Sequence, residues 1–206
     1  METVFRARDA DTAPPLSAGE RVVRKASGVA QLARGSISKT LIGLRAGQCL
    51  RIGPRVLLRG VKGIELGSGV TLTDDVWLNV LVELGAASAP GLRIGDNVGL
   101  GRRTTVSVAM SVSIGDYSIT APNVLITDHN HAHHLADVPI RLQGITEPKP
   151  VVIGSGCWLG ANAVVLPGSI IGHSSVVGAN AVVRGTYPPH SLLVGNPARD
   201  VRSPAG

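Results

Sequence analysis

A six-residue period of mostly aliphatic side chains runs through most of this 206-residue chain. The repeat positions are Leu66, Leu72, Leu78, Leu84, Ile94, Leu100, Val106, Ile114, Thr120, Ile126, Ile153, Leu159, Val165, Ile171, Val177 and Val183. Four residues after most of them comes a second small or aliphatic residue, at Val70, Val76, Val82, Val98, Val124, Cys157, Ala163, Ser169, Ser175 and Ala181. This period matches neither the 3.6 residues of a helical turn nor a plain two-residue alternation. It predicts short strands joined by tight turns, and the earlier residues Ile52 and Leu58 fit the pattern more loosely.

The repeat predicts a stack of triangular coils. Three units close one coil of about 18 residues, and successive coils stack at the inter-strand spacing of about 4.8 Å. A narrow interior suits Val, Leu, Ile and Ala better than large rings, and aromatic residues make up only 2% of the chain. Hydrophobic residues make up 44%, which excludes a disordered chain. We therefore expect a mainly β, repetitive domain.

Three interruptions break the period. Two short interruptions lengthen the six-residue spacing, by four residues after Leu84 and by two residues after Val106. The long one separates Ile126 from Ile153 by 27 residues, 21 more than one unit. No turn needs that length, so we expect residues 128–150 to protrude from the coils. A long loop inside a compact domain is often functional.

Positive charge is concentrated at the N-terminal end. Residues 1–62 hold 12 Lys and Arg against 4 Asp and Glu, a balance of +8, whereas residues 63–206 hold 8 against 10, a balance of −2. A basic segment suits nucleic acid or an anionic membrane surface. The chain has too few aromatic residues for a base-stacking platform and no nucleic-acid-binding motif, so we expect no nucleic-acid partner. Peripheral membrane contact through this segment has no second sequence feature in its favour.

The sequence also indicates a compartment. No run approaches the roughly 20 apolar residues of a membrane-spanning helix, and the N-terminus lacks the apolar stretch of a secretory signal. Cys49 and Cys157 are too few for a disulfide framework. We therefore expect a cytoplasmic protein.

The chain from about residue 50 to residue 202 resembles the hexapeptide-repeat acyltransferases. The match is closest over Ile153–Arg202, which contains WLGANAVVLPG and the closing GNPAR. The resemblance implies a left-handed parallel β-helix, here placed at residues 49–186, with a protruding loop at 128–150. It leaves residues 1–48 as a basic N-terminal segment and residues 187–206 as a C-terminal segment, both candidate caps for the ends of the solenoid. It also implies a homotrimer, with each site between two prisms.

A histidine cluster opens the predicted loop, at His129, His131, His133 and His134. A neutral imidazole titrates near pH 6.5, so it can take a proton from a hydroxyl at neutral pH. In the family, a histidine at the start of the protruding loop has this role, and the string ITDHNH resembles the sugar and polysaccharide O-acetyltransferase branch. The resemblance implies that His129 is the general base, with His131 as the alternative. Asp128, Asn79 and Asn130 are the candidates for orienting the ring, and Asp128 is included in the predicted catalytic set.

Two other interpretations of the histidine cluster stay open. A His-x-His-x-His-His string binds zinc or nickel when a turn gathers the rings, and a γ-class carbonic anhydrase shares the β-helix. That enzyme needs ligands on successive coils, and His173 and His190 are not convincingly placed for this, so we predict no metal site. Alternatively the histidines are inert on a polar loop, which suits His133 and His134 best.

Cys157 and Trp158 are adjacent in the sequence but have different expected orientations. Cys157 occupies the small inward position of its unit and is expected to be a buried thiol rather than a nucleophile. Trp158 precedes the inward Leu159 and is expected to point outward. By resemblance, this indole lies beside the pantetheine arm of coenzyme A.

The resemblance adds further candidates for binding coenzyme A, namely Gly160, Ala161, Gly178, Ala179 and Arg199. Small residues let a thin ligand approach the backbone, although the same residues also suit turns. Arg199 and Arg202 suit the phosphates of coenzyme A, or equally a solvated cap.

Together these features predict an acetyl-CoA-dependent O-acetyltransferase that acts on a hydroxyl of a sugar, sugar nucleotide or polysaccharide. Acetyl-CoA would be the co-substrate, with no metal and no covalent enzyme intermediate. The alternative on the same scaffold is N-acetylation of an amino-sugar or an amino acid. Alternatives from other classes are a non-catalytic β-helix scaffold and a carbonic anhydrase relative.

Overall fold

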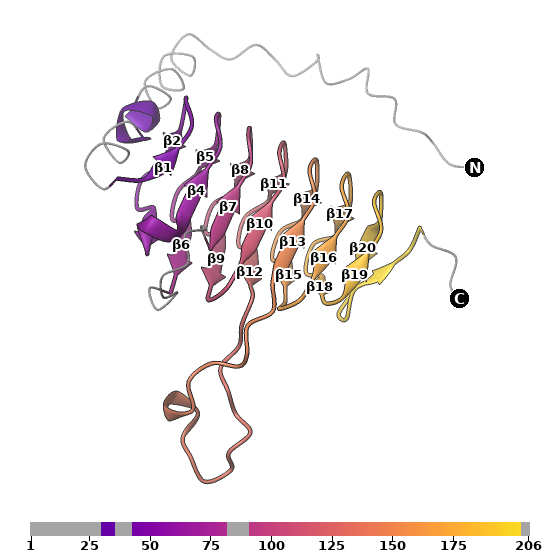
Figure 1. Cartoon of the computed structure of the whole chain (residues 1–206). Coiled ribbons are helices and arrows are strands. Elements are labelled where there is room, and N and C mark those ends of the chain that lie inside the picture. Colours follow the sequence, from indigo (N-terminus) through magenta and orange to yellow (C-terminus); the bar gives the residue numbers. More distant parts are fainter. Residues whose placement is uncertain (1–29, 36–42, 82–90, 203–206) are drawn as a thin grey trace.

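The chain forms a three-sided prism of short β-strands, a left-handed parallel β-helix (Figure 1). The computed structural model describes residues 30–35, 43–81 and 91–202. Each coil contributes one strand to each of three sheets, which confirms the architecture that the six-residue period predicts. Within these residues, no helix has the length and apolar character needed to cross a membrane.

The three sheets run side by side along the prism. The first sheet contains β1 (Arg45–Ala46), β4 (Ile64–Leu66), β7 (Leu92–Ile94), β10 (Val112–Ile114), β13 (Val151–Ile153), β16 (Ile170–Ile171) and β19 (Thr186–Tyr187). The second contains β2 (Arg51–Ile52), β5 (Thr71–Leu72), β8 (Gly99–Leu100), β11 (Ile119–Thr120), β14 (Trp158–Leu159), β17 (Val176–Val177), β20 (Leu192–Val194) and β21 (Arg199–Asp200). The third contains β3 (Leu57–Arg59), β6 (Trp77–Val80), β9 (Thr105–Val108), β12 (Leu125–Thr127), β15 (Val164–Val165) and β18 (Val182–Val183). The strand pairings are parallel except that of β20 with β21, which is antiparallel.

The repeat positions stack on one another inside the prism. The register pairs Ile153 with Ile171 and Leu159 with Val177, each 18 residues apart, as three units of six predict. These side chains are buried, and so are the small second positions such as Val70, Ala163 and Ala181. Fully burying an aliphatic side chain contributes roughly 1.5–3 kcal/mol, so the interior stack is what holds the coils together.

The corners between strands depend on left-handed backbone conformations. Asn123, Asn162 and Asn180 stack on successive coils with φ of 62°, 60° and 59°, a region that asparagine tolerates better than most residues. The Nδ2 of Asn123 donates to Oδ1 of Asn162 at 3.1 Å, and the Nδ2 of Asn162 donates to Oδ1 of Asn180 at 3.0 Å. This asparagine ladder ties neighbouring coils together at one corner.

The interruptions fall at the corner between the third and first sheets. The register pairs Ile94 with Ile114 and Ile114 with Ile153, which confirms the insertions of two and 21 residues. The first interruption is larger than the sequence predicted, because Leu66 pairs directly with Ile94, 28 residues later, so that coil holds ten extra residues rather than four. Leu84, which the period assigned to a repeat position, lies outside the described residues. Leu84 lies six residues after Leu78 and so continues the period by coincidence, which is why the sequence did not indicate where this insertion begins.

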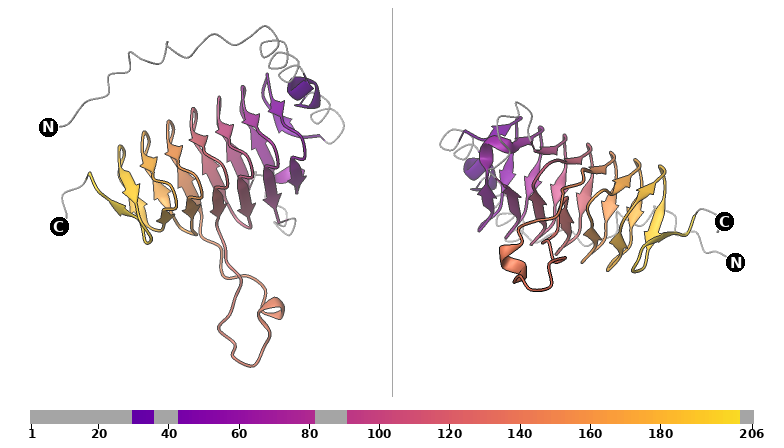
Figure 2. Two further views of the ribbon diagram at one scale, coloured as in Figure 1. Left: turned by 180° about the vertical axis from the view of Figure 1, so that it is seen from behind. Right: turned by 60° about the horizontal axis from the view of Figure 1, so that its bottom comes forward.

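Residues 128–150 leave the prism as a protruding loop, as the sequence predicts (Figure 2). A hydrogen bond from the Thr146 N–H to the Asn130 carbonyl (2.8 Å) and a bridge between His131 and Ile145 close its neck. The loop contains one short 3-10 helix, η3 (Ile140–Leu142). Its exposed apolar side chains are Leu135, Ile140, Leu142 and Ile145.

Other segments contact both ends of the prism. Residues 30–35 are helical, and the Nε of Arg34 donates to the carbonyl of Ile52 on the first strand of the second sheet (2.8 Å). A second 3-10 helix, η2 (Val61–Gly63), joins β3 to β4. At the other end, β21 folds back on β20, and the Tyr187 hydroxyl donates to the Ala198 carbonyl at 3.1 Å. These bonds satisfy backbone groups at edges that would otherwise be open.

Candidate active site

His129 and Asp128 form a hydrogen-bonded pair where the loop leaves the third sheet. Strand β12 ends at Thr127, so both residues directly follow a rigid element. The Nδ1 of His129 lies 2.7 Å from Oδ1 of Asp128. The carboxylate thus contacts the ring at Nδ1, and Nε2 is the ring nitrogen outside this contact. The imidazole is 12% exposed and the carboxylate is fully buried, so the ring alone reaches the surface.

Three backbone N–H groups hold the Asp128 carboxylate. Its Oδ1 accepts from Ala109 (2.8 Å), and its Oδ2 accepts from Met110 (2.7 Å) and Ser111 (2.8 Å). All three donors belong to the corner of the preceding coil, where the insertion of two residues widens the turn after β9. Charge-assisted hydrogen bonds of this kind compensate the burial of a carboxylate. The second interruption of the period therefore builds the socket that fixes Asp128, and Asp128 fixes the imidazole.

A polar row on the outer face of the third sheet leads to this pair. The register aligns Asn79, Ser107 and Thr127 on adjacent strands. Asn79 is 6% exposed and donates from Nδ2 to Oγ of Ser107 at 3.1 Å. Among the described residues, its buried Oδ1 has no hydrogen-bond partner. An unpaired buried acceptor costs roughly 1–3 kcal/mol, so a donor from a bound molecule would remove a standing penalty here.

The other residues of the histidine cluster lie further along the loop. The N–H of Asn130 donates to Oγ1 of Thr146 at the neck (3.1 Å), and Asn130 lines a hollow beside the neck. His131, the alternative base, is exposed and forms the neck bridge to Ile145. The Nδ1 of His133 lies 3.3 Å from the His131 carbonyl, and His133 and His134 are exposed. Of this cluster, His129 has the buried carboxylate beside it.

The described part of the chain contains no group of three or more His, Cys, Asp or Glu side chains arranged to hold a metal ion. His173 and His190 do meet on successive coils, with ring centroids 4.9 Å apart in an edge-to-face arrangement. Two imidazoles are fewer than the three protein ligands of a catalytic zinc site.

Trp158 lies across the prism from His129. It belongs to β14 in the second sheet, where it pairs with Ile119 and Val176. Its side chain is 50% exposed, which confirms the outward orientation. The loop that carries His129 leaves the corner between the third and first sheets, and the second sheet forms the opposite face (Figure 1). One chain alone therefore does not bring the predicted base and the predicted cofactor residues together.

The small residues assigned to coenzyme A occupy the corner after the second sheet, on the same side as Trp158. They are Gly160, Ala161, Gly178 and Ala179. A Cβ on Gly160 would lie 2.6 Å from the Ala179 nitrogen, and one on Gly178 would lie 3.1 Å from Cγ1 of Val194. Close stacking of the coils thus requires glycine at position 160 irrespective of any ligand.

The two C-terminal arginines differ in their contacts. Arg199 is exposed in β21, at the end of the second sheet that also carries Trp158. Arg202 donates from Nη1 to the carbonyl of His190 at 3.0 Å. Arg202 therefore belongs to the end of the prism, whereas the Arg199 side chain faces solvent.

Cys157 is a core thiol, as its place in the repeat predicts. It is buried, and its Sγ lies 3.3 Å from the carbonyl of Gly172. Burial raises the pKa of the Cys157 thiol. A group that is less ionised and enclosed is a poor nucleophile.

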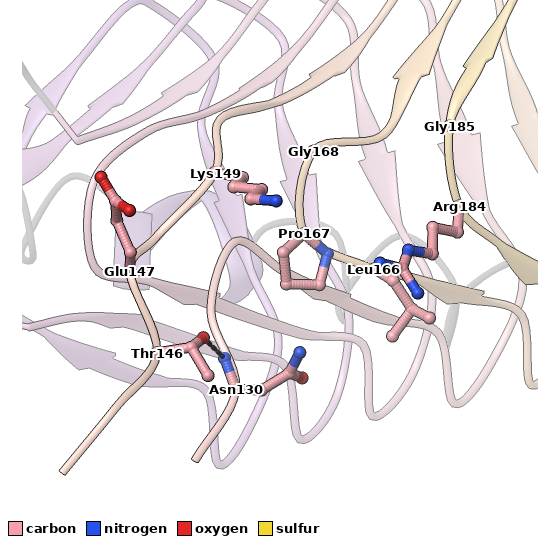
Figure 3. Close-up of a pocket in the computed structure, with 9 residues that line it drawn as sticks. All are labelled: Asn130, Thr146, Glu147, Lys149, Leu166, Pro167, Gly168, Arg184 and Gly185. Atoms are coloured by element: carbon pink, nitrogen blue, oxygen red, sulfur yellow. Dashed lines mark hydrogen bonds between the residues drawn. The ribbon is translucent and has the colours of Figure 1, made fainter. Parts of the chain in front are cut away.

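A hollow beside the loop neck was missed by the sequence analysis. Figure 3 shows its lining, which comprises Asn130, Thr146, Glu147, Lys149, Leu166, Pro167, Gly168, Arg184 and Gly185. Lys149 reaches it from the end of the loop, and Arg184 reaches it from a corner two coils further on. Asn130, which lines the hollow, directly follows His129 in the chain. The sequence does contain a signal for these two cations. Lys149 and Arg184 stand at the two ends of a stretch that contains no Asp, Glu, Lys or Arg.

Family models match both halves of the prism. The model described as bacterial transferase hexapeptide (six repeats) matches residues 150–185, and the one described as hexapeptide repeat of succinyl-transferase matches residues 91–128. The chain belongs to the hexapeptide-repeat transferases.

Two curated relatives of this hexapeptide-repeat transferase are named as acetyltransferases. Rv3034c of Mycobacterium tuberculosis is 35% identical over 158 residues, which cover 73% of this chain and 52% of the relative. WbbJ of Escherichia coli, named as a lipopolysaccharide biosynthesis O-acetyltransferase, is 41% identical over 113 residues, which cover 52% of this chain and 58% of the relative. The chain thus spans about half the length of these relatives.

A solved structure shares the fold of this transferase. It is a variant of AntD, an N-acyltransferase from Bacillus cereus, in complex with dTDP-4-amino-4,6-dideoxyglucose and coenzyme A. The TM-score is 0.67 at 17% identity, over 82% of this chain and 87% of that chain. At this identity the likeness concerns the fold alone.

Proposed function

We propose that this protein transfers an acetyl group from acetyl-CoA to a hydroxyl of a sugar, sugar nucleotide or polysaccharide. The His129–Asp128 pair at the loop base carries the proposal. An imidazole that a buried carboxylate holds at Nδ1, in a side chain that reaches the surface, has the geometry of a general base. The identity to WbbJ, named as an O-acetyltransferase, supports a hydroxyl as the acceptor.

The proposed reaction uses the imidazole twice. Nε2 of His129 takes the proton of the acceptor hydroxyl as its oxygen attacks the thioester carbonyl carbon. A C–O bond forms, the tetrahedral intermediate collapses, and the C–S bond breaks. The imidazolium then returns its proton to the departing thiolate, which leaves as the free thiol of coenzyme A. Asp128 would stabilise the imidazolium throughout, as buried carboxylates do in catalytic triads. Neither a metal ion nor a covalent enzyme intermediate takes part.

Two polar features suit the acceptor side of this reaction. The unpaired Oδ1 of Asn79 lies on the row that leads to the loop base, and a rotation of this buried amide towards the surface would let it accept a hydrogen bond from a substrate hydroxyl. Lys149 and Arg184 place two cations along the hollow at the loop neck, which Asn130 also lines. These cations suit the phosphate groups of a bound ligand.

We propose that the complete site forms between copies of the chain. His129 and Trp158 lie on opposite sides of one prism, so a ring of copies would place the loop of one against the second sheet of the next. A homotrimer of this kind unites the base with the proposed coenzyme A residues, which are Trp158, Gly160, Ala161, Gly178, Ala179 and Arg199. It would also cover the exposed apolar side chains of the loop.

The remaining parts of the proposal follow from the chemistry. A protein that consumes acetyl-CoA in this way would act in the cytoplasm, without nucleic acid as a partner. Residues 1–48 and 187–206 would cap the ends of the prism, consistent with the hydrogen bonds from Arg34 to Ile52 and from Tyr187 to Ala198. The likeness to AntD gives no specific support to an amine acceptor, because it concerns the fold alone.

The deciding experiment measures release of free thiol from acetyl-CoA with a panel of sugar acceptors. Thiol release with sugars that have hydroxyls but no amine supports O-acetylation, whereas turnover with amino-sugars or amino acids alone supports N-acetylation. His129→Ala should lower kcat by about 10²–10⁴-fold while acetyl-CoA still binds, because proton transfer is lost and the binding surface is not. His131→Ala is the matched control and should keep near wild-type turnover. The reverse outcome, with His131 essential and His129 dispensable, would refute the assignment.

A further inference from the structure

The first coil of the prism carries five exposed cations, which we call the N-terminal collar. Arg45 lies on the first sheet in β1, Arg51 on the second in β2 and Arg59 on the third in β3. Arg55 occupies the corner between β2 and β3, and Lys62 lies in η2. Residues 43–63 contain no Asp or Glu. The collar therefore surrounds the prism axis at one end, with a cation on every face.

Among the described residues, two members of the collar lie beside acids of the next coil, because Arg45 is opposite Glu65 in the register and Arg55 is ion-paired. The Nε and Nη2 of Arg55 contact the Asp75 carboxylate of the next coil at 2.5 and 2.9 Å. Hydrogen bonding to Arg55 holds the pKa of Asp75 below its usual range. Within residues 43–81 and 91–202, no ion pair is formed by the other four, Arg45, Arg51, Arg59 and Lys62.

The rest of the chain does not share this charge. Residues 1–42 hold 7 Lys and Arg against 4 Asp and Glu, so the segment before the collar has the same sign. Residues 63–206 hold 8 against 10, and residues 150–183 contain no Lys, Arg, Asp or Glu. The prism is thus cationic at its N-terminal end and close to neutral along its C-terminal coils.

The radial arrangement distinguishes between two kinds of anionic partner. A linear polyanion lies along one face and contacts one of the three sheet arginines. A plane perpendicular to the prism axis approaches all three faces at once, since long arginine side chains can bend towards a surface. Charges more than about 8 Å away are screened at physiological salt, so only groups close to the plane contribute. The helical residues 30–35 lie at the same end, where Arg34 donates to the Ile52 carbonyl, so they would meet such a surface together with the collar. The collar and Arg34 therefore fit an extended flat anionic surface.

We propose that the N-terminal end of the prism docks end-on to a bilayer that contains anionic phospholipids. Each Lys or Arg near such a surface adds a similar increment of binding, and four collar cations without an ion pair in the described residues give the molecule a fixed orientation. Docking holds the prism upright with the neutral coils away from the lipid. This inference does not depend on the proposed acetyl transfer.

The test is co-sedimentation of the full-length protein with lipid vesicles. The protein should bind vesicles of phosphatidylcholine with about 30% phosphatidylglycerol, should not bind phosphatidylcholine alone, and should be released by salt. Arg45→Gln, Arg51→Gln and Arg59→Gln should each weaken binding about fivefold, because each removes one cation from the plane. The matched control combines Arg103→Gln and Arg141→Gln, two exposed arginines away from the collar that form no ion pair within the described residues, and it should change binding less than about twofold.

Thermal unfolding of every variant shows whether it is folded, and the single substitutions keep the test valid if a combined variant does not fold. Failure of the wild type to bind anionic vesicles would overturn the proposal. So would equal losses in the collar variants and the control, which would show a dependence on net charge alone. A loss confined to one of the three faces, with heparin competing for the protein, would instead indicate a linear polyanion.

Discussion

Oδ1 of Asp128 lies 2.7 Å from Nδ1 of His129, and the same carboxylate accepts three backbone N–H groups from the corner of the preceding coil. The orientation of the imidazole is therefore coupled to the stacking of the coils rather than to the loop. A base held in this way is already oriented before substrate binds, which lowers the cost of reaching the transition state.

Replacing Asp128 tests this coupling directly. Asp128→Asn should lower kcat by about 10²–10⁴-fold with little change in the KM for acetyl-CoA, because an amide neither stabilises the imidazolium nor holds the Nδ1–H tautomer. Steady-state kinetics and chemical denaturation, measured together, separate lost catalysis from lost folding. Asp137→Asn, in the exposed part of the loop, is the control and should behave as wild type. Wild-type kcat in Asp128→Asn would show that the pair has no catalytic role.

Mixing two inactive variants tests whether the site is shared between copies. His129→Ala and Trp158→Ala should each be impaired alone. Co-expressed in equal amounts, they should recover about a quarter of wild-type activity, since about one site in four then combines an intact His129 with an intact Trp158 from the neighbouring copy. Activity is measured on purified mixed oligomers. No recovery in oligomers shown to contain both variants would place both residues in one chain's site.

Asn79 should show opposite effects on stability and activity. Asn79→Val removes the unpaired Oδ1, so the free energy of unfolding should stay level or rise by up to about 1 kcal/mol. Acetyl transfer should fall, because the acceptor loses a hydrogen-bond partner. Denaturation curves and the thiol-release assay measure the two effects. A marked loss of stability would indicate that Asn79 is structural.

Gly160 should be required by stacking, whether or not it also contacts coenzyme A. Gly160→Ala places a Cβ about 2.6 Å from the Ala179 nitrogen and should lower the free energy of unfolding by about 1–3 kcal/mol. The matched control is Gly99→Ala, where the nearest atom is Cγ2 of Ile119 at 3.6 Å, and its effect should stay within about 0.5 kcal/mol. Equal effects in the two variants would contradict the close approach.

The two cysteines should react at very different rates. Cys49 is exposed and should react quickly with an aromatic disulfide reagent, whereas Cys157 should react only on unfolding. Burial raises the pKa of Cys157, so its thiolate fraction at pH 8 is smaller than that of an exposed thiol. Reagent titration of native and denatured protein should give one and then two thiols, and Cys49→Ser should remove the fast phase. A fast phase that survives in Cys49→Ser would mean that Cys157 is accessible.

The sequence predicts the scaffold better than the site. Repeat positions such as Leu159 and Val177 are buried in register, and the long insertion lies where the period stops. The first interruption was misjudged, because residues that continued the period by coincidence concealed where it starts. The location of His129 at the loop base followed from the motif and the break at Ile126, whereas its catalytic role stays a prediction.

What the sequence determined by itself is the three-sided prism, because the interior of each coil depends on side-chain size at two positions in every six residues, and those positions are visible in the chain. What only the tertiary structure decided is which groups meet across coils. The three N–H groups that hold Asp128 come from a corner 17 to 19 residues away, and their approach depends on how the inserted residues fold. His129 and Trp158 likewise lie apart because His129 follows a strand of the third sheet, whereas Trp158 belongs to the second sheet on the other side of the prism. A linear pattern fixes which residues face inward, but contacts between coils arise only when the backbone has closed around the core.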